Sequence, residues 1–99
     1  MDKELIEIIS HYGVRDQLKY LQSEVYELTE AIIDYQYVEV YSGSPAQRVQ
    51  KKHVAEEIAD VLVMLLQFKE YYHIDDKDIK KIMKEKIKRQ LERIENESN

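Results

Sequence analysis

Several residue types are rare or missing in this 99-residue chain, and each absence excludes a class of protein. There is no cysteine, which excludes disulfides and thiolate metal sites and fits a reducing cytoplasm. Only two glycines and one proline interrupt the helical periodicity, so we expect an all-α protein. The apolar runs are too short to span a bilayer and the N-terminus has no signal-peptide pattern, so we expect a cytoplasmic protein without a membrane partner.

The charge is unevenly distributed along the chain. The net charge is −5, but residues 77–93 carry eight Lys or Arg against three acids, a balance of +5. Residues 1–76 carry seven basic and fifteen acidic residues, a balance of −8. An acidic part beside a basic helix suits a metal–polyphosphate ligand, and the overall acidity argues against nucleic-acid binding as the main role. The length fits a single domain over residues 1–99.

The apolar pattern predicts four helices. Gly13 is placed to end the first, Pro45 to open the third, and Asp75 to cap the fourth. Residues 35–41 alternate in a way that is also compatible with a strand, but an isolated strand has no pairing partner, so we expect the end of a helix and a loop there. The expected helices span residues 5–12, about 16 to 37 or 41, 45 to about 72, and about 76–95.

Two acidic motifs, Glu24-x-x-Glu27 and Glu57-x-x-Asp60, lie inside strongly apolar helical patterns. Residues three apart share a helix face, so each motif presents two carboxylates in one direction. At about 100° per residue, Glu24 falls roughly 40° from Leu28, inside the apolar stripe of its helix. An ionised carboxylate in such surroundings must be paired, hydrogen-bonded or bound to a cation. Two such helices facing each other would form an oxygen-rich site of the kind that Mg²⁺ favours.

Other polar residues are candidates for binding a substrate. Gln17 lies two turns before Glu24 in the same sector of its helix. Lys86, Arg89 and Arg93 cluster on one flank of the apolar stripe of the last helix. Arginine binds phosphate oxygens in a bidentate way and lysine adds a point charge, so this flank is a candidate phosphate site.

The ordered set of motifs resembles the MazG-like all-α nucleoside triphosphate pyrophosphohydrolases, in their short, phage-type, single-domain form. Three segments carry the resemblance: Gln17-Leu18-x-x-Leu21-x-x-Glu24-x-x-Glu27-Leu28-x-x-Ala31-Ile32, Glu56-Glu57-Ile58-Ala59-Asp60-Val61-Leu62, and Ile74-Asp75-Asp76 followed by Lys86-x-x-Arg89-x-x-x-Arg93. The resemblance implies a four-helix bundle-type domain that oligomerises through helix faces, as a homo-dimer or a dimer of dimers. It implies Mg²⁺, with Mn²⁺ as a substitute, on catalytic carboxylates at Glu24, Glu27, Glu57 and Asp60. It further implies hydrolysis of a nucleoside triphosphate to the monophosphate and pyrophosphate, with house-cleaning of the nucleotide pool as the role.

Three alternatives follow from the same residues. A phosphoribosyl-ATP pyrophosphohydrolase typically has a Tyr-His pair soon after the second acidic motif, where this chain has Val63-Met64. A di-iron carboxylate bundle needs two Glu-x-x-His motifs, and only Glu70-x-x-His73 is present. A non-catalytic helical interaction module would use the same apolar stripes, and its acids would bind no metal.

Overall fold

Four α-helices make up the described part of the chain, residues 2–98 of the computed structural model. The helices are α1 (Asp2–Tyr12), α2 (Val14–Tyr41), α3 (Ser44–Tyr71) and α4 (Asp76–Ser98). No strand occurs among these residues, so the predicted all-α fold is confirmed. Residues 35–41 are the last turns of α2, which makes the strand alternative wrong and replaces the expected loop with helix. Within residues 2–98, none of the helices combines the length and hydropathy that a bilayer crossing requires.

Short junctions determine how the first three helices follow one another. Gly13 alone separates α1 from α2, and its φ of 90° is a backbone conformation that favours glycine. Its N–H donates to the Ile9 carbonyl at 2.8 Å, and its own carbonyl accepts from the Gln17 N–H at 3.1 Å. The predicted end of the first helix at Gly13 is therefore confirmed. Pro45 lies in the first turn of α3, as predicted, so only residues 42 and 43 connect α2 to α3.

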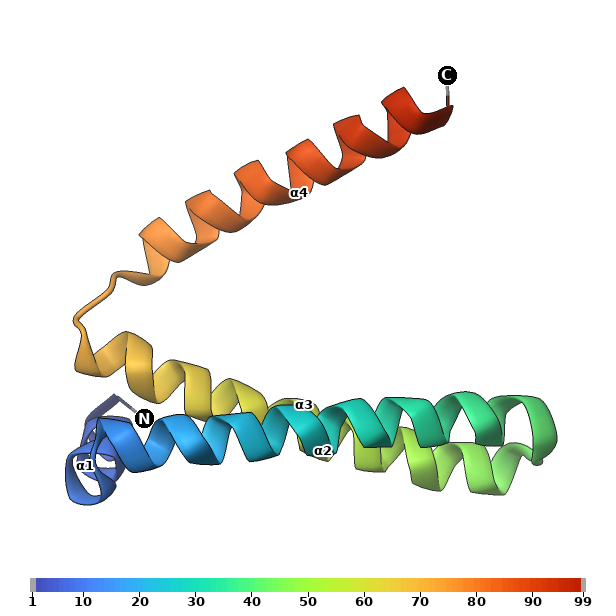
Figure 1. Cartoon of the computed structure of the whole chain (residues 1–99), viewed down its shortest axis with the longest axis horizontal. Helices are drawn as coiled ribbons and strands as arrows, with labels where there is room; N and C mark the ends of the chain where they lie inside the picture. Colours follow the sequence, from blue (N-terminus) through green and yellow to red (C-terminus); the bar gives the residue numbers. More distant parts are fainter. Residues whose placement is uncertain (1, 99) are drawn as a thin grey trace.

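The two long helices α2 and α3 form an antiparallel hairpin, and α1 packs against both at one end of it (Figure 1). The seam between α2 and α3 is unusually polar. The buried residues of α2 are Gln17, Glu24 and Ala31, and those of α3 are Glu57, Met64 and Gln67. Members of the α2 set are seven positions apart, which places them on one helix face.

Apolar residues of α2 recur at spacings of three and four and form a stripe that is only partly covered: Leu18, Leu21, Val25, Leu28 and Ile32. Leu18, Val25 and Ile32 remain 49%, 45% and 43% exposed, whereas Leu21 and Leu28 are half-buried. The reason is that α2 turns Gln17 toward its neighbours, and the next residue on a helix points about 100° away. Much of the stripe therefore forms an outer surface of the hairpin, which agrees with the oligomer that the resemblance implies.

Helix α4 stands apart from the other three (Figure 1). Apart from one ion pair at its first residue, it packs against none of the other described helices. Its apolar side chains are exposed, among them Met83 at 54%, Ile87 at 54% and Leu91 at 62%. The radius of gyration is accordingly 17.3 Å, whereas a compact domain of this length has about 13 Å. A single copy of the chain therefore has four helices but does not close them into one bundle.

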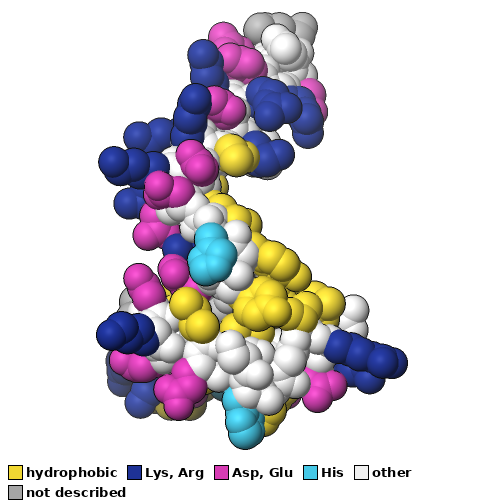
Figure 2. All heavy atoms as spheres, turned by 90° about the vertical axis from the view of Figure 1, so that its left-hand side faces the viewer, with side chains coloured by type: hydrophobic (Ala, Val, Ile, Leu, Met, Phe, Trp, Pro, Cys, Tyr) yellow, Lys and Arg dark blue, Asp and Glu magenta, His cyan; other side chains and the backbone are white. Residues whose placement is uncertain are grey.

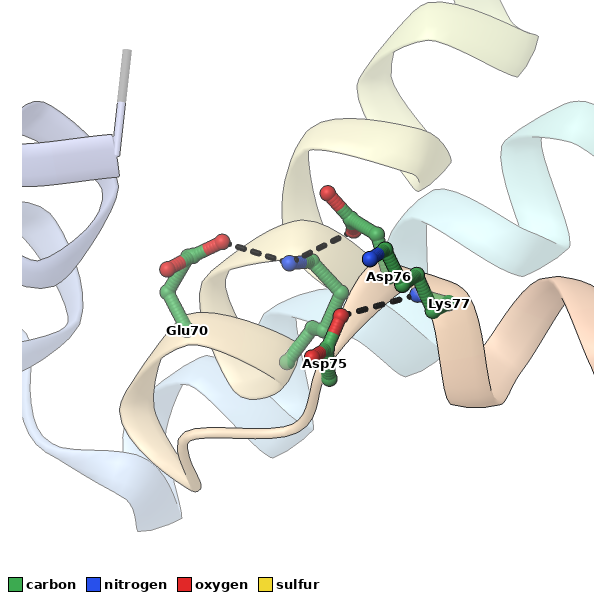
Figure 3. Close-up of polar contacts among 5 residues, drawn as sticks. Glu70, Asp75, Asp76 and Lys77 are labelled. Atoms are coloured by element: carbon green, nitrogen blue, oxygen red, sulfur yellow. Dashed lines mark hydrogen bonds and ion pairs between the residues drawn. The ribbon is translucent and has the colours of Figure 1, made fainter.

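A cluster of polar contacts lies at the junction between α3 and α4 (Figure 3). Lys69 donates to Glu70 Oε1 at 2.5 Å and to Asp76 Oδ1 at 2.8 Å. Pairing with Lys69 lowers the pKa of the Asp76 carboxyl and raises that of the Lys69 ammonium. Asp75 accepts a hydrogen bond from the Lys77 N–H at 2.9 Å, which confirms its predicted role as N-cap. His73, at φ 55°, reverses the chain just before this cap.

Hydrophobic side chains form a band that continues from the α1–α3 part onto α4, with Lys and Arg side chains gathered beside it on α4 (Figure 2). The buried apolar residues, by contrast, are few: Leu5, Ile9, Ala31 and Met64. An apolar surface this extensive usually marks an association site.

Candidate functional site

Three carboxylates from the two long helices converge in the middle of the hairpin. Glu24 of α2 and Glu57 and Asp60 of α3 each offer an oxygen, and these oxygens lie within 4.8 Å of one another. Glu24 and Glu57 are only 7% and 9% exposed, whereas Asp60 is open to solvent. The structure therefore brings together three of the four carboxylates that the motifs singled out, in a site that is buried on one side and accessible on the other.

One oxygen of each buried carboxylate lacks a hydrogen-bond partner. Glu24 Oε2 and Glu57 Oε2 are both buried and unbonded. Neither acid takes part in the ion pairs that Lys69 makes with Glu70 and Asp76. Two buried carboxylate oxygens without a partner are costly unless a cation binds them. Carboxylate oxygens are the ligands that hard divalent cations prefer, so the donor set fits such an ion.

Electrostatics within the cluster point the same way. Burial raises the pKa of the Glu24 carboxyl above its ordinary value, and the charges of Glu27, Asp60 and Glu57 raise it further. The converging acids repel one another in the absence of a cation, and a bound divalent ion would relieve that repulsion. We call Glu24, Glu57 and Asp60 the carboxylate trio.

Glu27 lies beside the trio and not within it. Its side chain is exposed on α2, and its carboxylate is close enough to raise the pKa of Glu24. A helix turn separates it from Glu24, so it shares the flank as predicted but points outward. Its role as a metal ligand remains a prediction.

A cavity of about 490 Å³ adjoins the trio. Glu24 and Asp60 form part of its wall, and α1 contributes Ile8 and Tyr12 to the opposite part. Tyr20 of α2 also lines it. Small-molecule pockets typically measure about 300–1,000 Å³ and combine apolar walls with a few polar groups. The cavity therefore has the size and lining of a ligand site directly beside the candidate metal ligands.

Gln17 lines this cavity, and it is paired with a residue that the sequence analysis did not identify. Gln17 Nε2 donates to Gln67 Oε1 at 2.7 Å, across the α2–α3 seam. Gln17 is 6% exposed and Gln67 2%. The signal for Gln67 was present, because Glu57, Asp60, Met64 and Gln67 follow one another at helical spacings of three and four.

The basic residues do not reach the site within one chain. Lys86, Arg89 and Arg93 lie on the exposed surface of α4, which stands away from α2 and α3. Arg89 and Arg93 line one shallow hollow on α4. Their expected phosphate contacts therefore remain a prediction, and within a single copy nothing brings them to the carboxylate trio.

Comparisons with known proteins agree with this geometry. A search of curated proteins and a search of solved structures return no significant match. The family model of the MazG nucleotide pyrophosphohydrolase domain matches residues 12–94. That match spans α2, α3 and most of α4, and it includes every member of the carboxylate trio. The chain therefore belongs to the MazG nucleotide pyrophosphohydrolase domain family.

Proposed function

We propose that the protein is a Mg²⁺-dependent hydrolase that converts a nucleoside triphosphate to the monophosphate and pyrophosphate. The observation that carries this proposal is the pair of buried, unbonded oxygens of Glu24 and Glu57 beside Asp60. The family supports nucleotide pyrophosphohydrolysis as the type of reaction. Removal of unwanted nucleotides from the cellular pool is the role that this activity suits.

The metal would be held by the carboxylate trio, with Glu27 as the fourth predicted ligand and Mn²⁺ as an alternative ion. When bound, it would neutralise phosphate oxygens and stabilise the charge that develops at the attacked phosphorus. Asp60 is the exposed member of the trio, so the phosphate chain would approach from its side. Glu24 and Glu57 would form the fixed, buried part of the site.

The reaction itself needs no covalent nucleophile from the chain. A water oxygen attacks the α-phosphorus. The bond from this phosphorus to the oxygen that bridges the α- and β-phosphates breaks, and pyrophosphate leaves with the electron pair. One of the four carboxylates of the two motifs accepts the proton of the water. Glu27 suits this task, because it lies beside the trio and is open to solvent, and the one of its two oxygens that is not bound to the metal would accept the proton.

Cations for the outer phosphates would come from a second copy of the chain. Lys86, Arg89 and Arg93 cannot serve the site of their own chain while α4 stands away from it. Residues 77–93 carry a balance of +5 and residues 1–76 one of −8, so α4 of one copy is attracted to the hairpin of another. The exposed apolar stripes of α2 and α4 support the same association. A homo-dimer or a dimer of dimers is therefore part of the proposal.

Pyrophosphate release from a panel of nucleoside triphosphates tests the proposal. Wild type should be active with Mg²⁺ and inactive with excess EDTA, and Glu57→Gln should abolish the activity. Glu56→Gln is the matched control, because Glu56 is the neighbouring residue of α3 and is exposed. Activity that survives both EDTA and Glu57→Gln would refute a metal-dependent reaction at this site.

A further inference from the structure

The buried amide pair Gln17–Gln67 lies in the wall of the cavity beside the carboxylate trio. Burying amides between two helices is costly compared with apolar packing, unless each group is hydrogen-bonded. Apolar residues at both positions would join α2 and α3 more strongly. The pair is therefore better explained by what it offers to the cavity than by what it adds to stability.

One donor of the pair is poorly satisfied. Gln67 Nε2 has Met64 Sδ as its partner, at 3.7 Å, and a thioether sulfur is a weak acceptor. Gln67 Oε1 already accepts from Gln17, so the group that Gln67 has to offer is an N–H donor. Met64 and Gln67 both line the cavity. An oxygen acceptor that enters the cavity would therefore replace a weak hydrogen bond with a normal one.

The lining indicates which end of a nucleotide would enter. Among the described residues that line the cavity, none is Lys or Arg and three are acidic: Asp16, Glu24 and Asp60. A triphosphate would be repelled from the interior and kept at the trio, where a cation can bind it. Two tyrosines line the cavity, Tyr12 and Tyr20, and these residues are 58% and 57% exposed. Exposed aromatic rings can stack on a base. The neutral, flat nucleoside end fits this lining.

We propose that Gln67, held in place by Gln17, reads the nucleobase by donating a hydrogen bond to a carbonyl oxygen of the ring. Bases that carry such an oxygen are then favoured over adenine, which has none. This inference rests on the proposed function, because it presumes a triphosphate bound at the carboxylate trio. Gln67 is a specificity-determining residue in this account and takes no part in the bond-breaking step.

Inosine and adenosine provide a matched pair of probes, because their bases are purines that differ mainly at one position, a carbonyl oxygen against an amino group. The measurement is calorimetric titration of the protein with the α,β-methylene triphosphates of both nucleosides, which resist hydrolysis at the α-phosphorus, in the presence of Mg²⁺. Wild type should bind the inosine analogue about tenfold more tightly, the effect of one hydrogen bond that is made or left unmade. Gln67→Met should bring the two affinities within about twofold, while binding of Mg²⁺ alone stays unchanged.

Two further variants keep the test decisive. Gln67→Met leaves the Gln17 donor without its acceptor and can destabilise the hairpin. The double variant Gln17→Met/Gln67→Met removes both amides and leaves no half-made hydrogen bond, so it should fold and should also lose the preference. Gln50→Met is the control, because Gln50 is a partly buried α3 glutamine that bonds the Ala31 carbonyl at 3.2 Å and does not line the cavity. It should keep the preference.

The outcomes separate this inference from the function on which it rests. Equal binding of the two analogues by wild type would overturn the role of Gln67 and leave the proposed function standing. A preference that persists in the double variant would do the same. If Mg²⁺ binds but neither analogue does, the proposed function falls, and the inference falls with it.

Discussion

Replacing Glu24 with glutamine should stabilise the metal-free protein and destroy its metal site. Glu24 Oε2 is buried without a hydrogen bond, and burial together with three neighbouring carboxylates opposes its charge. An amide at this position carries no charge and can donate to the neighbouring carboxylates, which a carboxylate cannot do. The same substitution removes a ligand from the carboxylate trio.

The magnitude follows from the cost of an unsatisfied buried polar group, about 1–3 kcal/mol. For a domain of this size each kcal/mol shifts the midpoint of thermal unfolding by about 4–8 °C. In EDTA, Glu24→Gln should therefore unfold at least several degrees above wild type. In Mg²⁺ at a hundred times its dissociation constant, wild type should gain about 2.7 kcal/mol. The variant should gain little, so the difference between the two unfolding midpoints should shrink or change sign.

Thermal unfolding followed by circular dichroism, at one protein concentration, measures both effects. Glu56→Gln is the control, because an exposed substitution usually changes stability by less than about 0.5 kcal/mol. A lower midpoint for Glu24→Gln than for wild type in EDTA would refute the reasoning, since it would mean that the carboxylate is already well satisfied without a metal.

The pH dependence provides an independent check on Glu24. Its pKa is raised in the folded state, so the folded protein binds this proton more tightly than the unfolded chain does. Without metal, wild type should therefore gain stability as the pH falls through the folded-state pKa toward the ordinary value of 4.5, and the gain is complete below that value. Glu24→Gln has no such proton to bind, so its stability should vary less over that range. Equal pH profiles for the two proteins would mean that Glu24 is not the group responsible.

Two further predictions concern assembly, and a third concerns the turn between α3 and α4. Light scattering at tens of micromolar should report a dimer or tetramer. A monomer would contradict the proposal that a second copy covers the apolar stripes of α2 and α4. Mixing inactive Glu57→Gln with inactive Arg89→Ala/Arg93→Ala, after joint unfolding and refolding, should restore up to about a quarter of the wild-type activity, because a mixed dimer forms half of the molecules and has one intact site. No recovery would mean that α4 serves its own chain. Lys69→Met should speed amide exchange at the α3–α4 turn at pH 7 without loss of helix content, because it removes the ion pairs with Glu70 and Asp76. Unchanged exchange would mean that these ion pairs do not stabilise the turn.

Local signals in the sequence predicted the helices well, because each signal acts within a few residues. Gly13, Pro45 and Asp75 ended, opened and capped helices where the pattern placed them. The burial of Glu24 was predictable too, from its position within an apolar stripe.

Relations between distant helices were harder to predict. Periodicity shows that Leu18 and Val25 share a face, but not whether that face is covered by the same chain or by another. The ion pair between Lys69 of α3 and Asp76 of α4 joins two helices across a turn, and no helical pattern encodes it. The spacing in α3 places Gln67 on the face of Glu57 and Met64, but its pairing with Gln17 crosses the seam and is not encoded by any spacing within one helix.

The polar seam between α2 and α3 also constrains how this chain can be engineered. Gln17, Glu24, Glu57 and Gln67 occupy positions where leucine or methionine would join the helices more strongly. A search for thermostable variants that scores folding alone would therefore replace these four residues first. Each gain in stability would remove part of the site, which is a stability–activity trade-off located in one row of side chains. Selection for stability in this protein should consequently keep the seam fixed and change only the outer faces of the helices.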